Sequence, residues 1–248
     1  MTAALQVALV RVVTVAVLLG AWQALALSGV VYQDVVPPLG PIVSAAIATV
    51  LDPGFYYDAA VTIGEILVGY VLATAAGLAV GVVLGLSPFL RGAFMPYVDA
   101  LATTPKIIFL PIVMLGFGIG PSSKMALGAI AGFFPVVLST AAGLVEVEAV
   151  LVRVGRSFHL TPWQMVAKVY LPAVRGPIVS GMRLGLGVVV IAVLLAEIKF
   201  SNAGLGFRAI DAYNHFRIAE LYAVLAIIFL LAAAVNGAMS RLERSFEK

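Results

Sequence analysis

The side chains with the clearest chemical potential are Lys106 and Glu197, two ionisable residues that adjoin long apolar sequence. An ammonium or carboxylate at membrane depth must face protein or water, because lipid does not solvate its charge. Such groups either line a solute pathway or fix neighbouring helices. Both interpretations stand here: Lys106 could also bond a backbone carbonyl, and Glu197 could hold a helix interface.

The residues needed for nucleophilic, redox or metal chemistry are absent or scattered. The chain has no cysteine, which excludes disulfides, thiol catalysis and cysteine-bound metals. Its two histidines, His159 and His215, have no third ligand at a recognisable spacing. Residues 120–124 lack the second glycine and the spacing of a nucleotide-binding phosphate loop. We therefore expect no catalytic residue, no metal site and no cofactor bound by this chain.

The composition places the chain in a lipid bilayer. Of its 248 residues, 62% are hydrophobic and 11% are charged, whereas about a quarter of residues are charged in soluble domains. A helix needs about 20 apolar residues to cross a ~30 Å hydrocarbon core. The basic residues are dispersed among loops, which argues against nucleic-acid binding. We predict an all-α integral membrane protein in which residues 1–248 form a single transmembrane domain.

Six apolar segments are long enough to cross the membrane. They cover about 8–27, 62–86, 97–115, 125–144, 184–198 and 218–239. The third is interrupted by Pro105 and Pro111, and prolines remove backbone donors and bend helices. The shorter apolar stretch 42–51 lies in a proline-rich loop, 28–58, and is predicted to form a surface helix because it is too short to cross.

Glycines recur along the second apolar segment at intervals of four or eight residues. They are Gly69, Gly77, Gly81 and Gly85. This spacing places them on one face of a helix, where small residues allow a second helix to approach closely. We expect them to serve helix packing.

The basic residues indicate the orientation of the six predicted spans. Six crossings place both termini on one side, and lysine and arginine are enriched on the cytoplasmic side. The segments that share the side of the termini carry Arg11, Arg91, Arg153, Arg156, Lys168, Arg175, Arg183, Arg241, Arg244 and Lys248. The opposite loops carry Lys124, Lys199, Arg208 and Arg217. We therefore expect both termini in the cytoplasm and the 28–58 loop outside.

The longest polar interruption, residues 153–172, has the signals of two helices joined by a tight turn. Thr161 and Gln164 form a capping box around Pro162, a proline at the first helical position. His159 lies at the junction, and histidine is among the non-glycine residues that most often adopt a positive φ. These residues alone are compatible with a structured loop between two spans and with a docking surface for a partner.

The spacing of this segment resembles the E-A-A loop of bacterial ATP-binding-cassette importer permeases. That pattern is E-A-A, three residues, G, nine residues, then I, any residue, L and P. Here it falls on Arg153, Val154, Gly155, His159, Val169, Leu171 and Pro172. The spacing and the Leu-Pro end are kept, while the glutamate, both alanines and the glycine are replaced.

Other segments extend the resemblance along the chain. The run from Thr104 to Pro111, followed by the glycine-rich run at 116–120, is similar to the third-span signature of the nitrate, sulfonate and taurine type of importer permease. The Gly-Met-Arg-Leu run at 181–184, Glu197, and the Asn-Ala-Gly-Leu-Gly run at 202–206 resemble its later segments. Several motifs occur in the family's order.

The resemblance implies the permease subunit of an ATP-driven importer in the bacterial cytoplasmic (inner) membrane. Its fold would have about six transmembrane helices and a cytoplasmic coupling-helix loop at about 146–177. Its implied partners are two ATP-binding-cassette ATPase subunits that bind ATP and Mg, a second copy of this permease, and an extracytoplasmic substrate-binding protein. The binding protein would deliver a small solute, which the permease would carry across the bilayer by alternating access.

The resemblance assigns one set of functional residues, and the ionisable, proline and aromatic residues of the spans indicate a second. Those expected to couple the permease to the ATPase are Arg153, Gly155, Arg156, His159, Leu160, Thr161, Gln164 and Pro172. Those expected along the translocation pathway are Pro105, Lys106, Phe109, Pro111 and Glu197.

Two other functional classes stay open from the sequence. A stand-alone secondary transporter or channel would have equally apolar spans, but it predicts an inverted internal repeat and function without an ATPase. We find no convincing repeat. A purely structural scaffold fits the packing glycines but leaves the capped helix pair unexplained.

Overall fold

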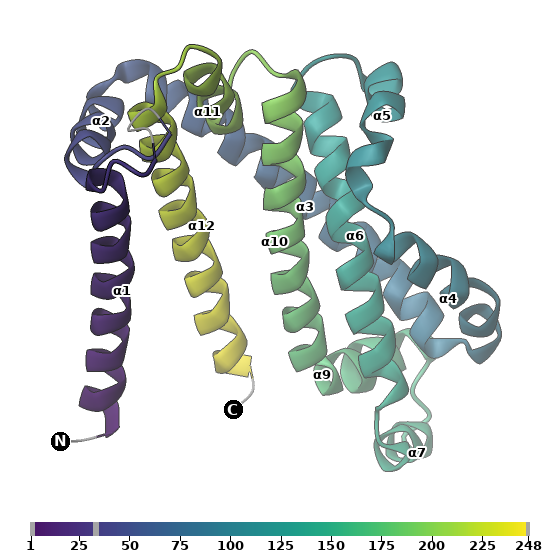
Figure 1. Ribbon diagram of the computed structural model, residues 1–248. Helices are drawn as coiled ribbons and strands as arrows, with labels where there is room; N and C mark the ends of the chain where they lie inside the picture. The colour runs from purple at the N-terminus through teal and green to yellow at the C-terminus, as the bar shows by residue number, and fades with distance from the viewer. Residues whose placement is uncertain (1–2, 32–34, 247–248) are drawn as a thin grey trace. The chain divides into compact units, whose positions relative to one another are not determined.

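The computed structural model describes residues 3–31 and 35–246 of the chain. Every described element of regular structure is a helix (Figure 1), which confirms the predicted all-α fold. Lys248, one of the basic residues used above to orient the spans, lies outside the described residues. The chain divides into two compact units, Met1–Tyr57 with Arg208–Phe229 and Asp58–Phe207 with Leu230–Lys248.

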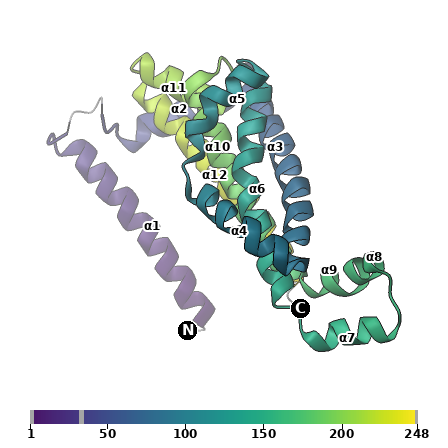
Figure 2. The same cartoon turned by 90° about the vertical axis from the view of Figure 1, so that its right-hand side faces the viewer.

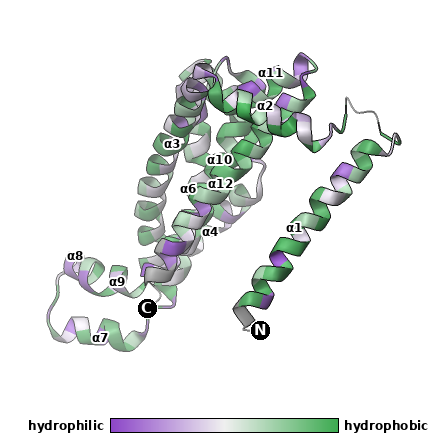
Figure 3. Cartoon of the chain, turned by 90° about the vertical axis from the view of Figure 1, so that its left-hand side faces the viewer, coloured by the Kyte–Doolittle hydropathy of each residue, from purple (hydrophilic) through white to green (hydrophobic). Residues whose placement is uncertain are grey.

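The first unit contains α1 (Ala3–Leu27), α2 (Leu39–Leu51) and the beginning of α12 (Ile218–Phe246). Trp22 of α1 connects these helices, since its indole nitrogen donates to the Pro37 carbonyl at 3.0 Å and its ring centroid lies 5.2 Å from that of Tyr222. Most of the α1 surface is exposed and apolar (Figure 3). Such a surface suits a helix that faces lipid.

The predicted surface helix between the first two spans is confirmed as α2, but the loop around it is shorter than expected. The next helix, α3 (Pro53–Leu86), begins at Pro53 because proline is well tolerated in a first helical turn. Asp52 joins the two helices and pairs with Arg208 of the same unit. The Arg208 guanidinium and the Gly54 amide hold the pKa of Asp52 below its ordinary value by hydrogen-bonding to the carboxylate.

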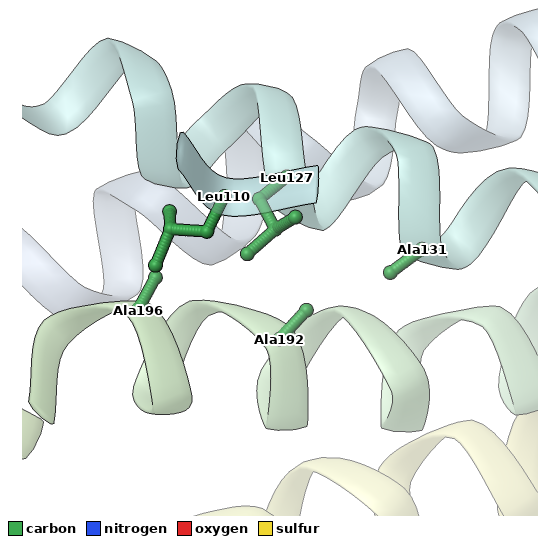
Figure 4. Packing of buried hydrophobic residues seen from close by; sticks show 5 residues of the cluster. All are labelled: Leu110, Leu127, Ala131, Ala192 and Ala196. Atoms are coloured by element: carbon green, nitrogen blue, oxygen red, sulfur yellow. The ribbon is translucent and has the colours of Figure 1, made fainter. Parts of the chain in front are cut away.

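The second unit contains most of the remaining helices and most of the buried core. Its elements after α3 are α4 (Pro88–Thr103), the 3-10 helix η1 (Lys106–Phe109), α5 (Leu110–Phe117), α6 (Pro121–Val145), α7 (Ala149–Ser157), α8 (Pro162–Met165), the π-helix η2 (Val166–Tyr170), α9 (Leu171–Ala173) and α10 (Arg175–Phe200), followed by the start of α11 (Leu205–Asn214). Helices α6 and α10 pack side by side (Figures 1 and 2). A buried cluster between these two helices and α5 joins Leu110, Leu127, Ala131, Ala192 and Ala196 (Figure 4).

The predicted break in the third span is confirmed. Segments Pro88–Thr103 and Lys106–Phe117 are bent by 95° relative to each other, and together with five longer apolar helices they give up to six candidate spans. The bend lies at Thr104 and Pro105, where the backbone is extended. Pro111 does not cause a break, because it occupies the first turn of α5. Backbone N–H groups in a first turn have no acceptor within the helix, so the N–H that proline lacks is not needed there.

Two other spans are longer than their apolar stretches. The fifth, α10, begins at Arg175 rather than near residue 184, and the sixth, α12, continues to Phe246 rather than ending near residue 239. Polar side chains at the surface end of a span do not stop a helix, because its hydrogen bonds are internal. Here Arg183 Nη1 donates to Glu243 Oε2 at 2.7 Å and joins the two helix ends.

The glycine face of α3 packs against α6, as the spacing predicts. A Cβ atom at Gly77 would lie 2.7 Å from Val136 Cβ, and one at Gly81 would lie 2.7 Å from Thr140 Cβ. The same contact continues at Gly85, next to Leu144. Only glycine allows the two backbones to approach this closely.

Gly81→Ala is expected to destabilise the helix bundle by about 1–3 kcal/mol, since the added methyl group must push apart two packed helices. Thermal unfolding of the purified protein in detergent measures this loss. Gly64→Ala is the matched control, because a Cβ at Gly64 on the same helix meets nothing within 4 Å. Equal stability of the two variants would contradict the close contact.

Candidate functional site

The polar interruption of the sequence folds into a compact helical hairpin. Helix α7 runs to Ser157, a turn follows, and α8, η2 and α9 return to the start of α10. Figure 2 shows these short helices projecting together at one end of the second unit. We call residues 149–173 the helical loop.

The turn of the helical loop has the capping geometry predicted from its sequence. Thr161 Oγ1 accepts from the Gln164 amide nitrogen at 3.3 Å, and Gln164 Oε1 accepts from the Thr161 amide nitrogen at 3.0 Å. His159 adopts φ of +52°, the left-handed backbone predicted where the related motif has glycine. Together the cap and the turn fix the angle at which α7 leaves α8.

A π-helical turn precedes Pro172 in the returning arm. Proline lacks an N–H and its ring clashes with the carbonyl four residues earlier, which in this chain belongs to Lys168. The wider turn of η2, Val166–Tyr170, relieves that crowding. Its curve leaves a groove of about 440 Å³ between the two arms, lined by Leu151, Val154, Gly155, Phe158, Leu160, Lys168, Val169, Pro172 and Ala173.

Gly155 faces its own chain. The resemblance places Gly155 among the residues that couple the permease to the ATPase, but Gly155 is buried, and a Cβ on it would lie 2.5 Å from Met165 Sδ and 3.1 Å from Val169 Cγ2. Its small size therefore allows the two arms of the helical loop to pack together. It sets the position of the outer face of α7 without belonging to that face.

Helix α7 carries an exposed apolar stripe, bordered by arginines, that extends to the rim of the groove. Val150, Val154 and Phe158 are 52%, 49% and 75% exposed, and their spacing of four residues aligns them along the helix. Arg153 and Arg156 are also exposed. Trp163, just after the turn, is 77% exposed. Apolar and aromatic side chains that stand free on a polar loop are typical of a protein-docking surface.

Lys106 lies at the break of the third span. Its ammonium donates to the carbonyl oxygens of Ala102 at 2.8 Å and Thr104 at 2.6 Å, and it lies 5.0 Å from the centre of the Phe134 ring. Its aliphatic stem and Pro105 contribute to a cavity of about 270 Å³. The other residues lining this cavity are Thr104, Ile107, Leu127, Ala131, Val188, Ile191, Ala192 and Leu195.

The remaining predicted pathway residues are not gathered around this cavity. Phe109 packs against the buried α5–α6–α10 cluster, and Pro111 is exposed in the first turn of α5. Glu197 is fully buried elsewhere, with Thr62 Oγ1 donating to its Oε1 and the Gly206 amide nitrogen donating to its Oε2, both at 2.7 Å. This geometry corresponds to the helix-fixing alternative for Glu197.

Four side chains gain importance only from the structure. Phe158 and Trp163 form the most exposed part of the helical loop, a feature that aromatic residues in an otherwise polar segment could have signalled. Glu65 and Lys124 meet in the buried interior, with Lys124 Nζ 2.8 Å from Glu65 Oε1, although the sequence suggested that Lys124 lies in a loop. Among the described residues, no group of three or more histidine or acidic side chains could hold a metal ion.

Comparison with known proteins gives one consistent result. The family described as "Binding-protein-dependent transport system inner membrane component" matches residues 69–248. The chain is 30% identical over 237 residues to the taurine transport system permease protein TauC of Escherichia coli (strain K12), covering 93% of this chain and 86% of that protein. It is 29% identical over 233 residues to the putative aliphatic sulfonates transport permease protein SsuC of Bacillus subtilis (strain 168), covering 94% and 84%.

A solved structure has the same fold. It is titled "Inward facing conformations of the MetNI methionine ABC transporter: CY5 SeMet soak crystal form", and the matched chain superimposes with a TM-score of 0.67 at 21% identity. The match covers 75% of this chain and 93% of that chain.

Proposed function

The chain belongs to the family of binding-protein-dependent transport system inner membrane components. On that premise we propose how it assembles, which surface binds the ATPase and which residues line the solute pathway. It is a multi-pass inner-membrane permease that provides a translocation pathway for a small solute, and it is a transport protein, not an enzyme. Its family implies ATPase and binding-protein partners.

In the proposed assembly, two copies of this chain associate with two ATP-binding-cassette ATPase subunits and one extracytoplasmic binding protein. ATP and Mg bind to the ATPase subunits, which hydrolyse ATP. Residues 1–248 act as one permease domain, with both termini and the coupling loop at 146–177 in the cytoplasm. The positive-inside distribution of arginine and lysine supports this orientation.

The exposed apolar stripe on α7 is the observation that carries the coupling assignment. Val150, Val154 and Phe158 are exposed, and the arginines beside them provide charge that can pair with acidic groups of a partner. The remaining predicted coupling residues hold this face in position. Gly155 lets the arms meet, His159, Thr161 and Gln164 set the turn, and Leu160 and Pro172 line the groove.

Movement of the ATPase subunits would be transmitted through the helical loop. The capped turn makes α7 a lever with a fixed angle, because its caps and its packing against Met165 resist local bending. A push on the stripe then displaces α9 and the start of α10, which follow directly in the chain. Alternating access requires such rigid transmission, since packed helices move as units.

Reconstitution tests the importer assignment. Vesicles that contain the permease, its candidate ATPase and its binding protein are expected to accumulate solute only when ATP is supplied on the ATPase side. The measurement is uptake of labelled solute with and without each component. Uptake by the permease alone would overturn the assignment and support the secondary transporter or channel that the sequence left open.

The solute is proposed to be a small sulfonate or a related small oxyanion. The names of TauC and SsuC state taurine and aliphatic sulfonates as the solutes of those proteins, and both carry a sulfonate group. In this chain, the Lys106 ammonium lies at the break of a span, and its positive charge attracts an anion. We place Pro105 and Lys106 along the pathway on this basis, whereas Phe109 and Pro111 have only the sequence prediction behind them and Glu197 has a separate role discussed below.

Lys106→Met is expected to lower the uptake rate about tenfold, because a charged hydrogen bond to an anion contributes about 1.5–3 kcal/mol. Assembly with the ATPase should be unchanged, and both are measured in the reconstituted system. Lys199→Met is the control, since Lys199 is an exposed lysine at the end of α10. Unaltered uptake by Lys106→Met would support a structural role through the Ala102 and Thr104 carbonyls.

A further inference from the structure

Three helices of the second unit bring ionisable side chains together in the protein interior. Glu65 comes from α3, Lys124 from the first turn of α6, and Glu197 from α10. Their exposures are 1%, 3% and 0%, and the neighbouring Thr62 is 2% exposed. All three helices are candidate membrane spans. Ionisable groups buried in this setting require a specific arrangement of charge.

The hydrogen bonds around these residues show which oxygen atoms act as hydrogen-bond acceptors. Lys124 Nζ lies 2.8 Å from Glu65 Oε1 and donates to Ser201 Oγ at 2.7 Å. Thr62 Oγ1 accepts from the Leu205 amide nitrogen at 2.8 Å, so its own hydrogen is directed to Glu197 Oε1. With the Gly206 amide on Oε2, both oxygens of Glu197 act as acceptors. Glu197 thus has the surroundings of a carboxylate.

By comparison, the carboxyl group of Glu65 lacks hydrogen-bond donors. No donor among the described residues makes a directed hydrogen bond to either of its carboxyl oxygens, although Lys124 Nζ lies 2.8 Å from Oε1. Its carboxyl group lies on the side of α3 that faces Glu197, because Thr62, three residues earlier on the same helix, donates to Glu197 Oε1 at 2.7 Å. Two carboxyl groups form a hydrogen bond only if one of them carries a proton, and two buried carboxylates in contact do not both ionise.

The count of buried charges also requires one bound proton on the two carboxyl groups. Two carboxylates and one ammonium would leave one uncompensated negative charge at membrane depth, an arrangement that costs several kcal/mol. One bound proton removes that charge. The other acidic group of α3, Asp58, lies one turn before Thr62, and its Oδ1 accepts from the Gly204 amide at 2.9 Å.

We propose that Glu65 and Glu197 form a proton-binding site, with the proton on the Glu65 oxygen that faces Glu197 and with Lys124 balancing the Glu197 carboxylate. The resulting chain runs from the Lys124 ammonium through the neutral Glu65 carboxyl group to the Glu197 carboxylate. It is neutral overall and joins α3, α6 and α10. A motion that separates α3 from α10 would break it, expose the carboxyl groups to water and release the proton.

Infrared spectroscopy of the full-length protein in D₂O at neutral pH tests this site directly. A protonated carboxyl group has a carbonyl stretching band that is separate from carboxylate bands, so the wild-type protein is expected to show an acid band. Glu65→Gln should remove that band and keep the fold, because a glutamine amide replaces the neutral donor and acceptor of the acid. Glu146→Gln, at an exposed carboxyl group, should leave the band unchanged.

Glu197→Gln is expected to affect thermal stability differently from Glu65→Gln. It would place an amide donor among the Thr62 and Gly206 donors, so it should lower thermal stability more than Glu65→Gln does. Absence of an acid band in the wild-type protein would overturn the proposal without any variant. Persistence of the full band in folded Glu65→Gln would overturn it as well. Neither measurement depends on transport, so failure of this proposal is distinguishable from failure of the importer assignment.

Discussion

Replacement of Gly155 by tryptophan is expected to abolish ATP-dependent uptake while the protein still inserts into the membrane. A single Cβ at Gly155 would already lie 2.5 Å from Met165 Sδ. An indole there must force α7 away from the returning arm, because packed interiors tolerate added volume poorly. The docking residues would all remain present, but at the wrong angle. Uptake into reconstituted vesicles and co-purification of the ATPase measure the loss.

Gly155→Ala is the informative control for that variant, and it is expected to retain uptake. Alanine is the residue of the related motif at this position, and it favours a helix by up to about 1 kcal/mol over glycine. The two nearest atoms it meets belong to the flexible end of Met165, which can move aside at little cost, and the third is Val169 Cγ2 at 3.1 Å. Gly20→Trp in α1 controls for the tryptophan itself, since nothing lies within 4 Å of a Cβ there. Full uptake by Gly155→Trp would refute the fixed-angle model.

Truncation of Phe158 is expected to weaken ATPase binding about 30-fold, with little effect on the permease alone. Phe158 is 75% exposed, so Phe158→Ala removes little packing from the isolated chain. Aromatic anchors at the centre of an interface typically contribute 2 kcal/mol or more, which corresponds to about that factor in affinity. Titration of the ATPase onto detergent-solubilised permease measures the change.

Tyr213→Ala is the matched control for Phe158→Ala. Tyr213 is another exposed aromatic residue, 57% exposed, on the short helix α11 outside the helical loop. ATPase affinity should not respond to this change. If both variants bind the ATPase as the wild type does, the apolar stripe of α7 is not the docking surface, and Trp163→Ala becomes the remaining test of this loop.

Local sequence signals predicted the local structure well. The Thr161–Gln164 capping box and the left-handed backbone at His159 were both expected from residue type and spacing, because a cap depends on neighbours within one turn. The apolar segments likewise indicated the spans, since crossing a bilayer requires length and hydrophobicity. Their ends were less accurate, as at Arg175 and Phe246, because a helix can continue into water without an apolar sequence.

The sequence by itself determined a six-span helical membrane protein with packing glycines, a broken third span and a capped hairpin that resembles an importer coupling loop. These features depend on composition and on periodicities within one helix. Only the tertiary structure decided that Gly155 faces Met165, that Phe158 and Trp163 are exposed, that Glu65 meets Lys124, and that Glu197 meets Thr62. Those contacts join residues as far apart as Thr62 and Glu197, which bond at 2.7 Å. The spacing of residues along one helix carries no information on which residue of another helix will lie opposite, because that is set by how the helices pack.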